Sequence, residues 1–227
     1  MDSIYFIAGI DTGIGKTVAT GLMARSLRAR GIDAITVKLV QTGNVGRSED
    51  IDTHRRICGG ARFYEDDLGL THPQVFKFPA SPELAARLEG KTVDLARIAM
   101  SIDYCRRNHQ VVLVEAAGGL HVPLTRELLT IDFAAQQGWP TVLVTCGRLG
   151  AVNHTLLAVE ALKARGMRLA GLVYDWHPEA DAQIDRDTPE IARAFLDRWG
   201  VSAPLVRVPQ VPAGGPYPEL DFSEIFA

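Results

Sequence analysis

The fold is decided by the stretch Gly9-Ile10-Asp11-Thr12-Gly13-Ile14-Gly15-Lys16-Thr17, which follows directly on the apolar run of residues 4–8. Residues 18–24, after it, have the pattern of a helix. A strand, a glycine-rich turn and a helix in this order are the context that a phosphate-binding loop requires. Glycines let successive backbone N–H groups converge on phosphate oxygens, and the start of a helix adds about half a positive charge. The sequence therefore predicts a nucleotide-binding loop.

Two side chains of this loop have predicted roles. Lys16 would reach the terminal phosphates of the nucleotide, and the Thr17 hydroxyl would hold Mg2+. The loop residues expected to contact the nucleotide are Gly13, Ile14, Gly15, Lys16, Thr17 and Val18. Five residues separate Gly9 from Gly15, one more than in the usual motif. The alternative is a glycine-rich turn with an incidental Gly-Lys-Thr, and the flanking strand and helix argue against it.

The composition argues against several kinds of partner. The 227 residues are 47% hydrophobic and 22% charged, as in ordinary soluble globular proteins. A formal net charge of -3 gives no electrostatic footprint for nucleic acid or an anionic membrane, so we expect neither as a partner. The three cysteines show no paired or zinc-like spacing, which favours a reducing compartment. With no secretory signal and no apolar run of membrane-spanning length, a cytoplasmic protein is expected.

Strand and helix patterns alternate along the chain. Continuous apolar runs, typical of strands buried on both faces of a parallel sheet, occur at 111–115, 141–145 and 169–174. Further strands are expected at 33–37 and 205–208. Helices are expected at 50–58, 82–90, 94–108, 131–137, 152–165 and 188–199. The tail from residue 212 is expected to be loop with a loosely held end.

This alternation predicts a single α/β domain over residues 1–227, with one doubly wound, mainly parallel sheet and helices on both faces. In such a sheet, ligands bind at the carboxyl ends of the strands. Lys38 ends the second strand, next to the phosphate loop, which favours a second cation for phosphoryl charge over a solvated lysine. Glu115 ends the third strand, where phosphate-loop enzymes commonly hold the metal, the alternative being a capping or salt-bridged carboxylate.

Two aspartates follow the polar loop of residues 39–50. Asp50 or Asp52 could supply a further metal oxygen, because Mg2+ prefers one or two carboxylates together with phosphate oxygens and waters. The six histidines show no metal-binding spacing, and His54 is expected to be a surface residue of the helix at 50–58. The residues by themselves do not separate Asp50 from Asp52.

Four segments resemble the ATP-dependent dethiobiotin synthetases of biotin biosynthesis, a family with the P-loop NTPase fold. They are Gly-Ile-Asp-Thr-Gly-Ile-Gly-Lys-Thr-Val at 9–18, Lys-Leu-Val-Gln-Thr-Gly at 38–43, Val-Glu-Ala-Ala-Gly-Gly at 114–119 and Leu-Gly-Ala-Val-Asn-His at 149–154. The first includes the extra loop residue. Their order and spacing cover essentially the whole chain, so the resemblance is far more specific than a lone phosphate loop.

The resemblance implies an Mg2+- and ATP-dependent ring closure of 7,8-diaminopelargonate with CO2 to dethiobiotin. A carbamate formed on one amine attacks the γ-phosphate, and the second amine displaces phosphate from the carbamic-phosphoric anhydride. Lys16 and Lys38 would be the catalytic cations. The alternative is a membrane- or DNA-associated switch ATPase of the partitioning type, which shares the fold. Such proteins carry a second lysine early in the loop, where Asp11 stands here.

Site residues follow from the same resemblance, position by position. The implied metal ligands are Thr17, Asp50 and Glu115, with Asp50 selected by counting back from Arg56-Ile57-Cys58-Gly59. The implied substrate contacts are Thr42, Gly118, Leu149, Gly150 and Asn153. The last three would come from the neighbouring subunit, so a homodimer with shared active sites is implied. Further implied nucleotide contacts are Gly118, Asp175, Val208 and Pro209.

Three residues depart from the family pattern. Leu39 stands for a proline, and Ala116 stands for a glycine, where its side chain could narrow the space beside the phosphates. Asp175 stands where some members use asparagine to read adenine. A charged aspartate only accepts hydrogen bonds, whereas an amide both donates and accepts, so the nucleobase preference is open at this stage.

Overall fold

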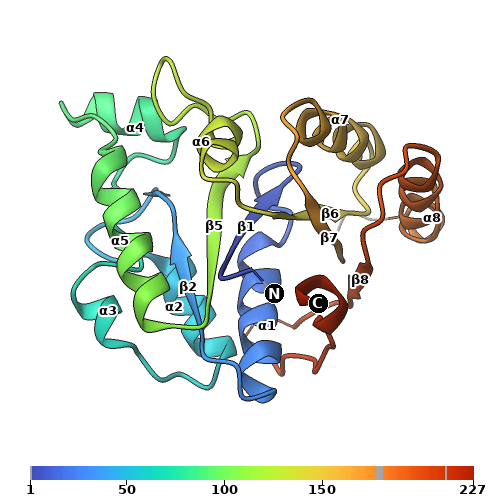
Figure 1. Ribbon diagram of the computed structural model, residues 1–227, viewed down its shortest axis with the longest axis horizontal. Coiled ribbons are helices and arrows are strands. Elements are labelled where there is room, and N and C mark those ends of the chain that lie inside the picture. The colour runs from blue at the N-terminus through green and yellow to red at the C-terminus, as the bar shows by residue number, and fades with distance from the viewer. Residues whose placement is uncertain (1, 177–180, 213) are drawn as a thin grey trace.

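The structure, a computed structural model, describes residues 2–176, 181–212 and 214–227. Its main sheet has six strands in the order β2-β5-β1-β6-β7-β8, and every neighbouring pair is parallel (Figure 1). The strands are β1 Ile4–Gly9, β2 Ala34–Lys38, β5 Val111–Gly119, β6 Thr141–Cys146, β7 Leu169–Asp175 and β8 Leu205–Val208. The predicted doubly wound parallel sheet is confirmed.

Eight α-helices are found in the described part of the chain. They are α1 Lys16–Ala29, α2 Glu49–Ile57, α3 Tyr64–Asp67, α4 Pro82–Leu88, α5 Leu95–Asn108, α6 Thr130–Gln136, α7 Ala151–Ala164 and α8 Ala182–Arg198. α8 begins earlier than the expected residue 188, because the Asp181 side chain accepts from Gln183 N at 2.7 Å and caps the helix there. No helix among the described residues is both long and apolar enough to cross a membrane.

Successive side chains of strand β1 point into two apolar cores on opposite faces of the sheet, as strand geometry requires. Phe6 belongs to the core beneath α5, α6 and α7, where Ile98 and Leu162 pack. Tyr5 belongs to the core on the opposite face, where Leu22 of α1 packs. Helices therefore cover both faces of the sheet, and the strand ends remain available for a ligand site (Figure 1).

Strand register brings the predicted site residues together. Glu115 of β5 lies opposite Ile7 of β1 on one side and Lys38 of β2 on the other. The phosphate loop runs from the end of β1 into α1, next to this point. A short second sheet, in which β3 Gln41–Thr42 pairs with β4 Val75–Phe76, follows β2 within stretches expected to be loop.

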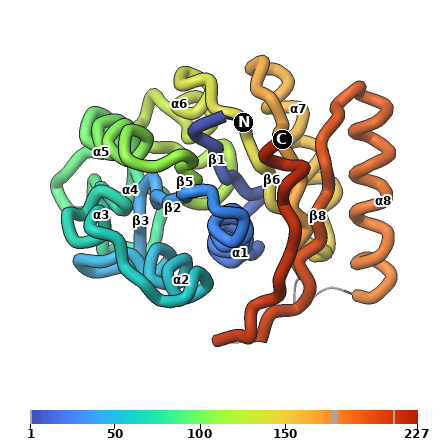
Figure 2. The backbone as a smooth tube through the Cα atoms, turned by 60° about the horizontal axis from the view of Figure 1, so that its bottom comes forward, coloured from blue at the N-terminus to red at the C-terminus, as the bar shows by residue number. Residues whose placement is uncertain are grey.

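The expectation of a loosely held C-terminal end is wrong. Phe222, Ile225 and Phe226 are buried, the last two in a short 3-10 helix, Ser223–Phe226. The Phe226 ring meets Tyr5 edge-on at 4.8 Å between centroids. A Cβ on Gly171 would come within 2.6 Å of Ile225 Cγ1, so the end of the chain packs directly on β7. Figure 2 shows this segment running beside β8 toward the N-terminus.

Phe222→Ala is expected to lower the free energy of unfolding by about 3–5 kcal/mol, because it empties a fully buried site in the core beneath α1. Denaturant unfolding followed by fluorescence measures the change. The exposed neighbour Glu224 provides the control, since Glu224→Ala should cost less than about 0.5 kcal/mol. Equal stabilities for the two variants would contradict the packing of this segment.

Candidate active site

The phosphate loop depends on glycine at two positions. Gly13 and Gly15 have φ angles of 72° and 89°, which side-chain-bearing residues rarely adopt. Lys16 then starts α1, and its side chain lies back over the loop so that Nζ donates to Asp11 O at 2.6 Å. A Cβ on Gly9 would lie within 2.9 Å of three Lys16 atoms. The loop thus has the close backbone and lysine arrangement that phosphate binding needs.

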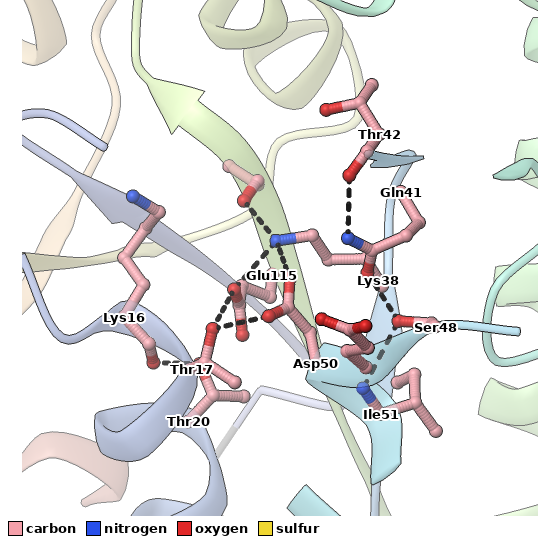
Figure 3. A network of polar contacts seen from close by, with 12 residues as sticks. Lys16, Thr17, Thr20, Lys38, Gln41, Thr42, Ser48, Asp50, Ile51 and Glu115 are labelled. Carbon is pink, nitrogen blue, oxygen red and sulfur yellow. Dashed lines mark hydrogen bonds and ion pairs between the residues drawn. The ribbon is translucent and has the colours of Figure 1, made fainter. Parts of the chain in front are cut away.

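Beside the loop, Lys38 joins two carboxylates from different elements (Figure 3). Its Nζ lies 2.8 Å from Glu115 Oε1, 2.6 Å from Asp50 Oδ2 and 3.1 Å from Ala116 O. Thr17 Oγ1 lies 2.9 Å from Asp50 Oδ1 and 3.0 Å from Glu115 Oε1. One residue each from α1, α2, β2 and β5 therefore meets at a single point.

The charges in this cluster stabilise one another. Burial by itself would raise the pKa of Glu115, but Lys38 and then His54 outweigh it and hold that pKa well below its usual range. Burial would likewise lower the pKa of Lys38, and Glu115 and Asp50 outweigh it, so this pKa is raised. Glu115 and Lys38 both stay charged at neutral pH. The lysine of the loop behaves differently, because burial and then the charge of Lys38 lower the pKa of Lys16 to about 8.

The oxygen atoms of this cluster fit a hard divalent cation. Thr17, Asp50 and Glu115 present one hydroxyl and two carboxylates, which is the donor set that Mg2+ uses with phosphate oxygens and water. No group of three or more His, Cys, Asp or Glu that could hold a metal occurs among the described residues, so a protein-only metal cage is not found there. Asp52 pairs instead with Arg62, at 3.2 Å.

A cavity of about 490 Å³ opens at this cluster. The predicted site residues that line it are Gly13, Ile14, Gly15, Lys16, Thr17, Val18, Lys38, Thr42, Asp50, Glu115 and Gly118. The cavity is also lined by residues to which the sequence assigned no role: Thr12, Val40, Gln41, Pro79, Ala80, Pro82, Ala117 and Val122. Residues 79–82 carried only a signal for turns and a helix start, since nothing local indicates that Pro79 packs against Gly43. Leu39 and Ala116, which differ from the family pattern, are both buried, and neither lines the cavity.

The predicted nucleobase residues do not line this cavity. Asp175 packs against the loop, since a Cβ on Gly15 would come within 1.5 Å of its Oδ2. Burial raises the pKa of Asp175 to about 8, opposed only by a backbone hydrogen bond from Trp176. Val208 pairs with Asp175 between β7 and β8, and Pro209 follows it, exposed. Asp175, Val208 and Pro209 are thus neighbours, but none of them is among the residues that line the 490 Å³ cavity.

The predicted carboxylate-binding helix start also lies outside the cavity. Gly150 caps α7 with a φ of 90°, and Asn153 in the first turn is exposed. Leu149 is 83% exposed. Arg148, just before it, donates to Asp11 of the phosphate loop. This segment therefore touches the loop and presents its apolar and polar side chains outward.

The expectation that His54 is a surface residue is wrong. Its side chain is fully buried and bonds Glu115 Oε2 through Nε2 at 2.8 Å. The position of α2 against β2 and β5 decides this, and the helical pattern of residues 50–58 does not reveal it. His54 is thus a residue of the site that sequence reasoning missed.

Comparisons with known proteins agree with this geometry. The sequence profile of the AAA domain family matches residues 3–212. The chain is 47% identical over 205 residues to the ATP-dependent dethiobiotin synthetase BioD of Chlorobaculum tepidum, covering 89% of this chain and 85% of that protein. It is 41% identical over 199 residues to the ATP-dependent dethiobiotin synthetase BioD 2 of Pasteurella multocida, covering 88% and 93%.

Similar solved structures include partitioning-type ATPases. The structure of pNOB8 ParA bound to nonspecific DNA matches with a TM-score of 0.54 at 14% identity, covering 87% of this chain and 76% of that one. A ParA family ATPase from Chlorobium tepidum TLS matches with a TM-score of 0.54 at 12% identity, covering 94% and 87%. At such low identity the likeness shows the fold alone, so it lends no support to a switch ATPase.

Asp175→Asn is expected to change how stability depends on pH. Because its pKa in the folded chain is about 8, the folded state holds a proton that the unfolded chain loses above the ordinary value of 3.8. This group's contribution to stability is therefore complete below about pH 4 and is lost progressively as the pH rises toward 8. Asparagine does not titrate. The stability of the variant relative to wild type should therefore increase between about pH 5 and pH 8 in urea unfolding.

The exposed residue Asp197 supplies the control for this measurement. Asp197→Asn should show no gain that grows with pH. A stability difference for Asp175→Asn that is the same at both pH values would contradict a proton held by the buried carboxyl.

Proposed function

The chain belongs to the family of ATP-dependent dethiobiotin synthetases, and we propose a mechanism in which its own residues carry out that ligase reaction with Mg2+. The observation that carries the proposal is the meeting of Lys38, Glu115, Asp50 and Thr17 at the mouth of the phosphate loop. Thr17, Asp50 and Glu115 would hold the metal, which supplies charge neutralisation when bound. Asp50 is preferred to Asp52, which is paired with Arg62.

Two lysines would stabilise the charge that develops on the transferred phosphoryl group. Lys16 starts the helix whose N-terminal N–H groups face the loop, and Lys38 lies across the cluster from it. A carbamate oxygen of the substrate forms a bond to the γ-phosphorus while the bond to the ADP oxygen breaks. The second amine then forms a bond to the carbamate carbon, phosphate leaves, and the ureido ring closes with loss of a proton to water.

The walls of the cavity suit an aliphatic diamine. Pro79, Ala80, Pro82 and Val122 provide apolar surface for the alkyl chain of 7,8-diaminopelargonate. We expect Thr42 and Gly118, which also line the cavity, to give polar contacts near its reacting end. Holding diamine, carbamate and phosphate in line contributes much of the rate enhancement, because proximity replaces a collision of separate molecules.

Asp175 would contact the nucleobase beside Val208 and Pro209. A carboxyl that keeps its proton at neutral pH presents one donor and one acceptor, the same pair that an amide presents. We infer that Asp175 substitutes for asparagine in reading adenine N7 and N6.

A homodimer with shared sites accounts for the helix start at Gly150. Leu149 is exposed and Asn153 faces outward, so a second copy could bring this segment against the first copy's cavity. Exposed N–H groups at a helix start favour an anion such as the substrate carboxylate. We propose that residues 1–227 act as one domain that pairs in this way.

Lys38→Ala is expected to lower the turnover rate by about 10²–10³-fold, because a preorganised cation is lost from the transition state. Phosphate release from ATP, which should require both the diamine and bicarbonate, measures the rate, and mass spectrometry identifies dethiobiotin. The control is Lys91→Ala, since this exposed lysine pairs with Glu89 far from the cluster. Unchanged turnover in Lys38→Ala would remove Lys38 from the mechanism, and turnover indifferent to the diamine would overturn the proposed reaction.

Shared sites predict that two defective chains complement one another. Lys38→Ala disables the cavity, and Asn153→Asp places a negative charge where the substrate carboxylate would bind. Co-expression with two different tags isolates the mixed dimer, which should recover about half of the wild-type turnover because one of its two sites has neither substitution. A mixed dimer as inactive as its parents would show that each site is built from one chain.

A further inference from the structure

We propose that His54 is a positioning residue that fixes the orientation of Glu115 at the end of a directed chain of hydrogen bonds from Asp66 through Arg55 and Thr36. The inference rests on the proposed role of Glu115 as a metal ligand. Asp66, Arg55, Thr36 and His54 lie outside the cavity lining, and no part of the mechanism above uses them. All five side chains are buried.

The chain starts at a rigid ion pair. Arg55 donates to both oxygens of Asp66, from Nε at 2.9 Å and from Nη2 at 2.8 Å. Thr71 and the Phe63 backbone also donate to Asp66. Burial would raise the pKa of Asp66, but Arg55 outweighs it, so the pKa is lowered and the carboxylate stays charged. A bidentate pair of this kind fixes the plane of the guanidinium.

The direction of each later bond follows from counting donors. Arg55 Nη1 lies 2.7 Å from Thr36 Oγ1, and a guanidinium can only donate, so the Thr36 oxygen accepts there. The hydroxyl has one proton of its own. His54 Nδ1, at 3.0 Å, is the other partner of this hydroxyl among the described residues, and it can take that proton only if it is unprotonated.

We infer the tautomer of His54 from this proton, because a Thr36 hydroxyl that accepted from both Arg55 and His54 would leave its own proton without a partner among the described residues. With Nδ1 accepting from Thr36, the ring proton stands on Nε2, which donates to Glu115 Oε2 at 2.8 Å. The other carboxylate oxygen, Oε1, faces Thr17 and Lys38. The two oxygens of Glu115 therefore have separate roles, since Oε2 is anchored inside the protein and Oε1 is presented to the site.

Anchoring of this kind affects a metal site through orientation. A ligating carboxylate with one oxygen held by a buried donor presents the other in one geometry, and loss of such a partner typically weakens metal affinity by about 10–100-fold. A merely structural buried histidine would instead affect stability and leave metal binding unchanged. The two roles can be separated by experiment.

The tautomer is tested first, without metal or turnover. Long-range 1H–15N correlation spectra of the 15N-labelled chain near neutral pH report which ring nitrogen of His54 carries the proton. The proposal expects a proton on Nε2 and none on Nδ1 in the wild type. Thr36→Val removes the hydroxyl that donates to Nδ1 with little change of shape, so the Nδ1 signal should shift as its hydrogen bond is lost while the proton stays on Nε2, which faces the Glu115 carboxylate. A proton on Nδ1 in the wild type, in a neutral or a charged ring, would overturn the proposal.

The effect on the site is tested with Mn2+ as the probe, by electron paramagnetic resonance in the presence of a non-hydrolysable ATP analogue. His54→Leu and Thr36→Val should each weaken Mn2+ binding by about 10-fold, and His54→Gln, which keeps a donor near Nε2, should recover most of it. In activity assays the same variants should raise the half-saturating Mg2+ concentration more than the KM for the diamine. The matched control is Ile57→Val, a buried change on the same helix, which should lower stability and leave Mn2+ binding unchanged.

Glu115→Gln separates the two levels of the proposal. If it leaves Mn2+ binding intact, Glu115 is not a ligand, and both the proposed metal site and the positioning role are overturned. If Glu115→Gln weakens Mn2+ binding while His54→Leu and Thr36→Val do not, the metal site stands and the role of His54 alone is overturned.

Discussion

The pairing of β2 with β5 is the constraint on which the rest of the structure depends. It sets Lys38 opposite Glu115 in register, and the two buried side chains meet at 2.8 Å. Breaking such a buried pair by removing one partner typically costs about 3–5 kcal/mol, because the remaining charge has no counterion. The ion pair between Lys38 and Glu115 therefore both stabilises the pairing of β2 with β5 and positions two residues of the proposed active site. A slip of the register by one residue would turn the lysine to the opposite face of the sheet and lose both.

β2 is an edge strand, and residues next to the site form hydrogen bonds with backbone groups on its free edge. Thr36 O accepts from Arg55 Nη2 at 3.3 Å, and Lys38 N donates to Thr71 O at 2.7 Å. Backbone groups that would otherwise face a neighbouring chain are thus satisfied internally. Because the same contacts hold Lys38 in place, protection of the edge and placement of the cation come from one set of bonds.

Sequence reasoning succeeded where a local rule or a sheet rule was sufficient. The glycines and Lys16 mark the loop by themselves, and the predicted parallel sheet brings Lys38 to Glu115. The expectation that Glu115 ends its strand is wrong, because β5 continues to Gly119. Sequence reasoning failed where partners come from remote elements. The spacing of Phe222, Ile225 and Phe226 suits an apolar face, but the short length of the segment hid it, and its partner Tyr5 lies at the other end of the chain. His54 looked exposed because helical spacing does not say which face meets the sheet.

The two buried lysines of the site, Lys16 and Lys38, differ in how their positive charges are neutralised. Both are almost fully enclosed, yet their pKa values move in opposite directions. Lys38 has carboxylates within hydrogen-bond distance, which outweigh the cost of burying its charge. Lys16 forms no ion pair within the described part of the chain, and its Nζ is bonded to the carbonyl oxygen of Asp11. The positive charge of Lys16 is therefore less well neutralised by protein groups than that of Lys38. A bound phosphate group would provide the missing negative charge. In the protein by itself, Lys38 is thus paired with carboxylates, whereas Lys16 is bonded to a neutral carbonyl oxygen.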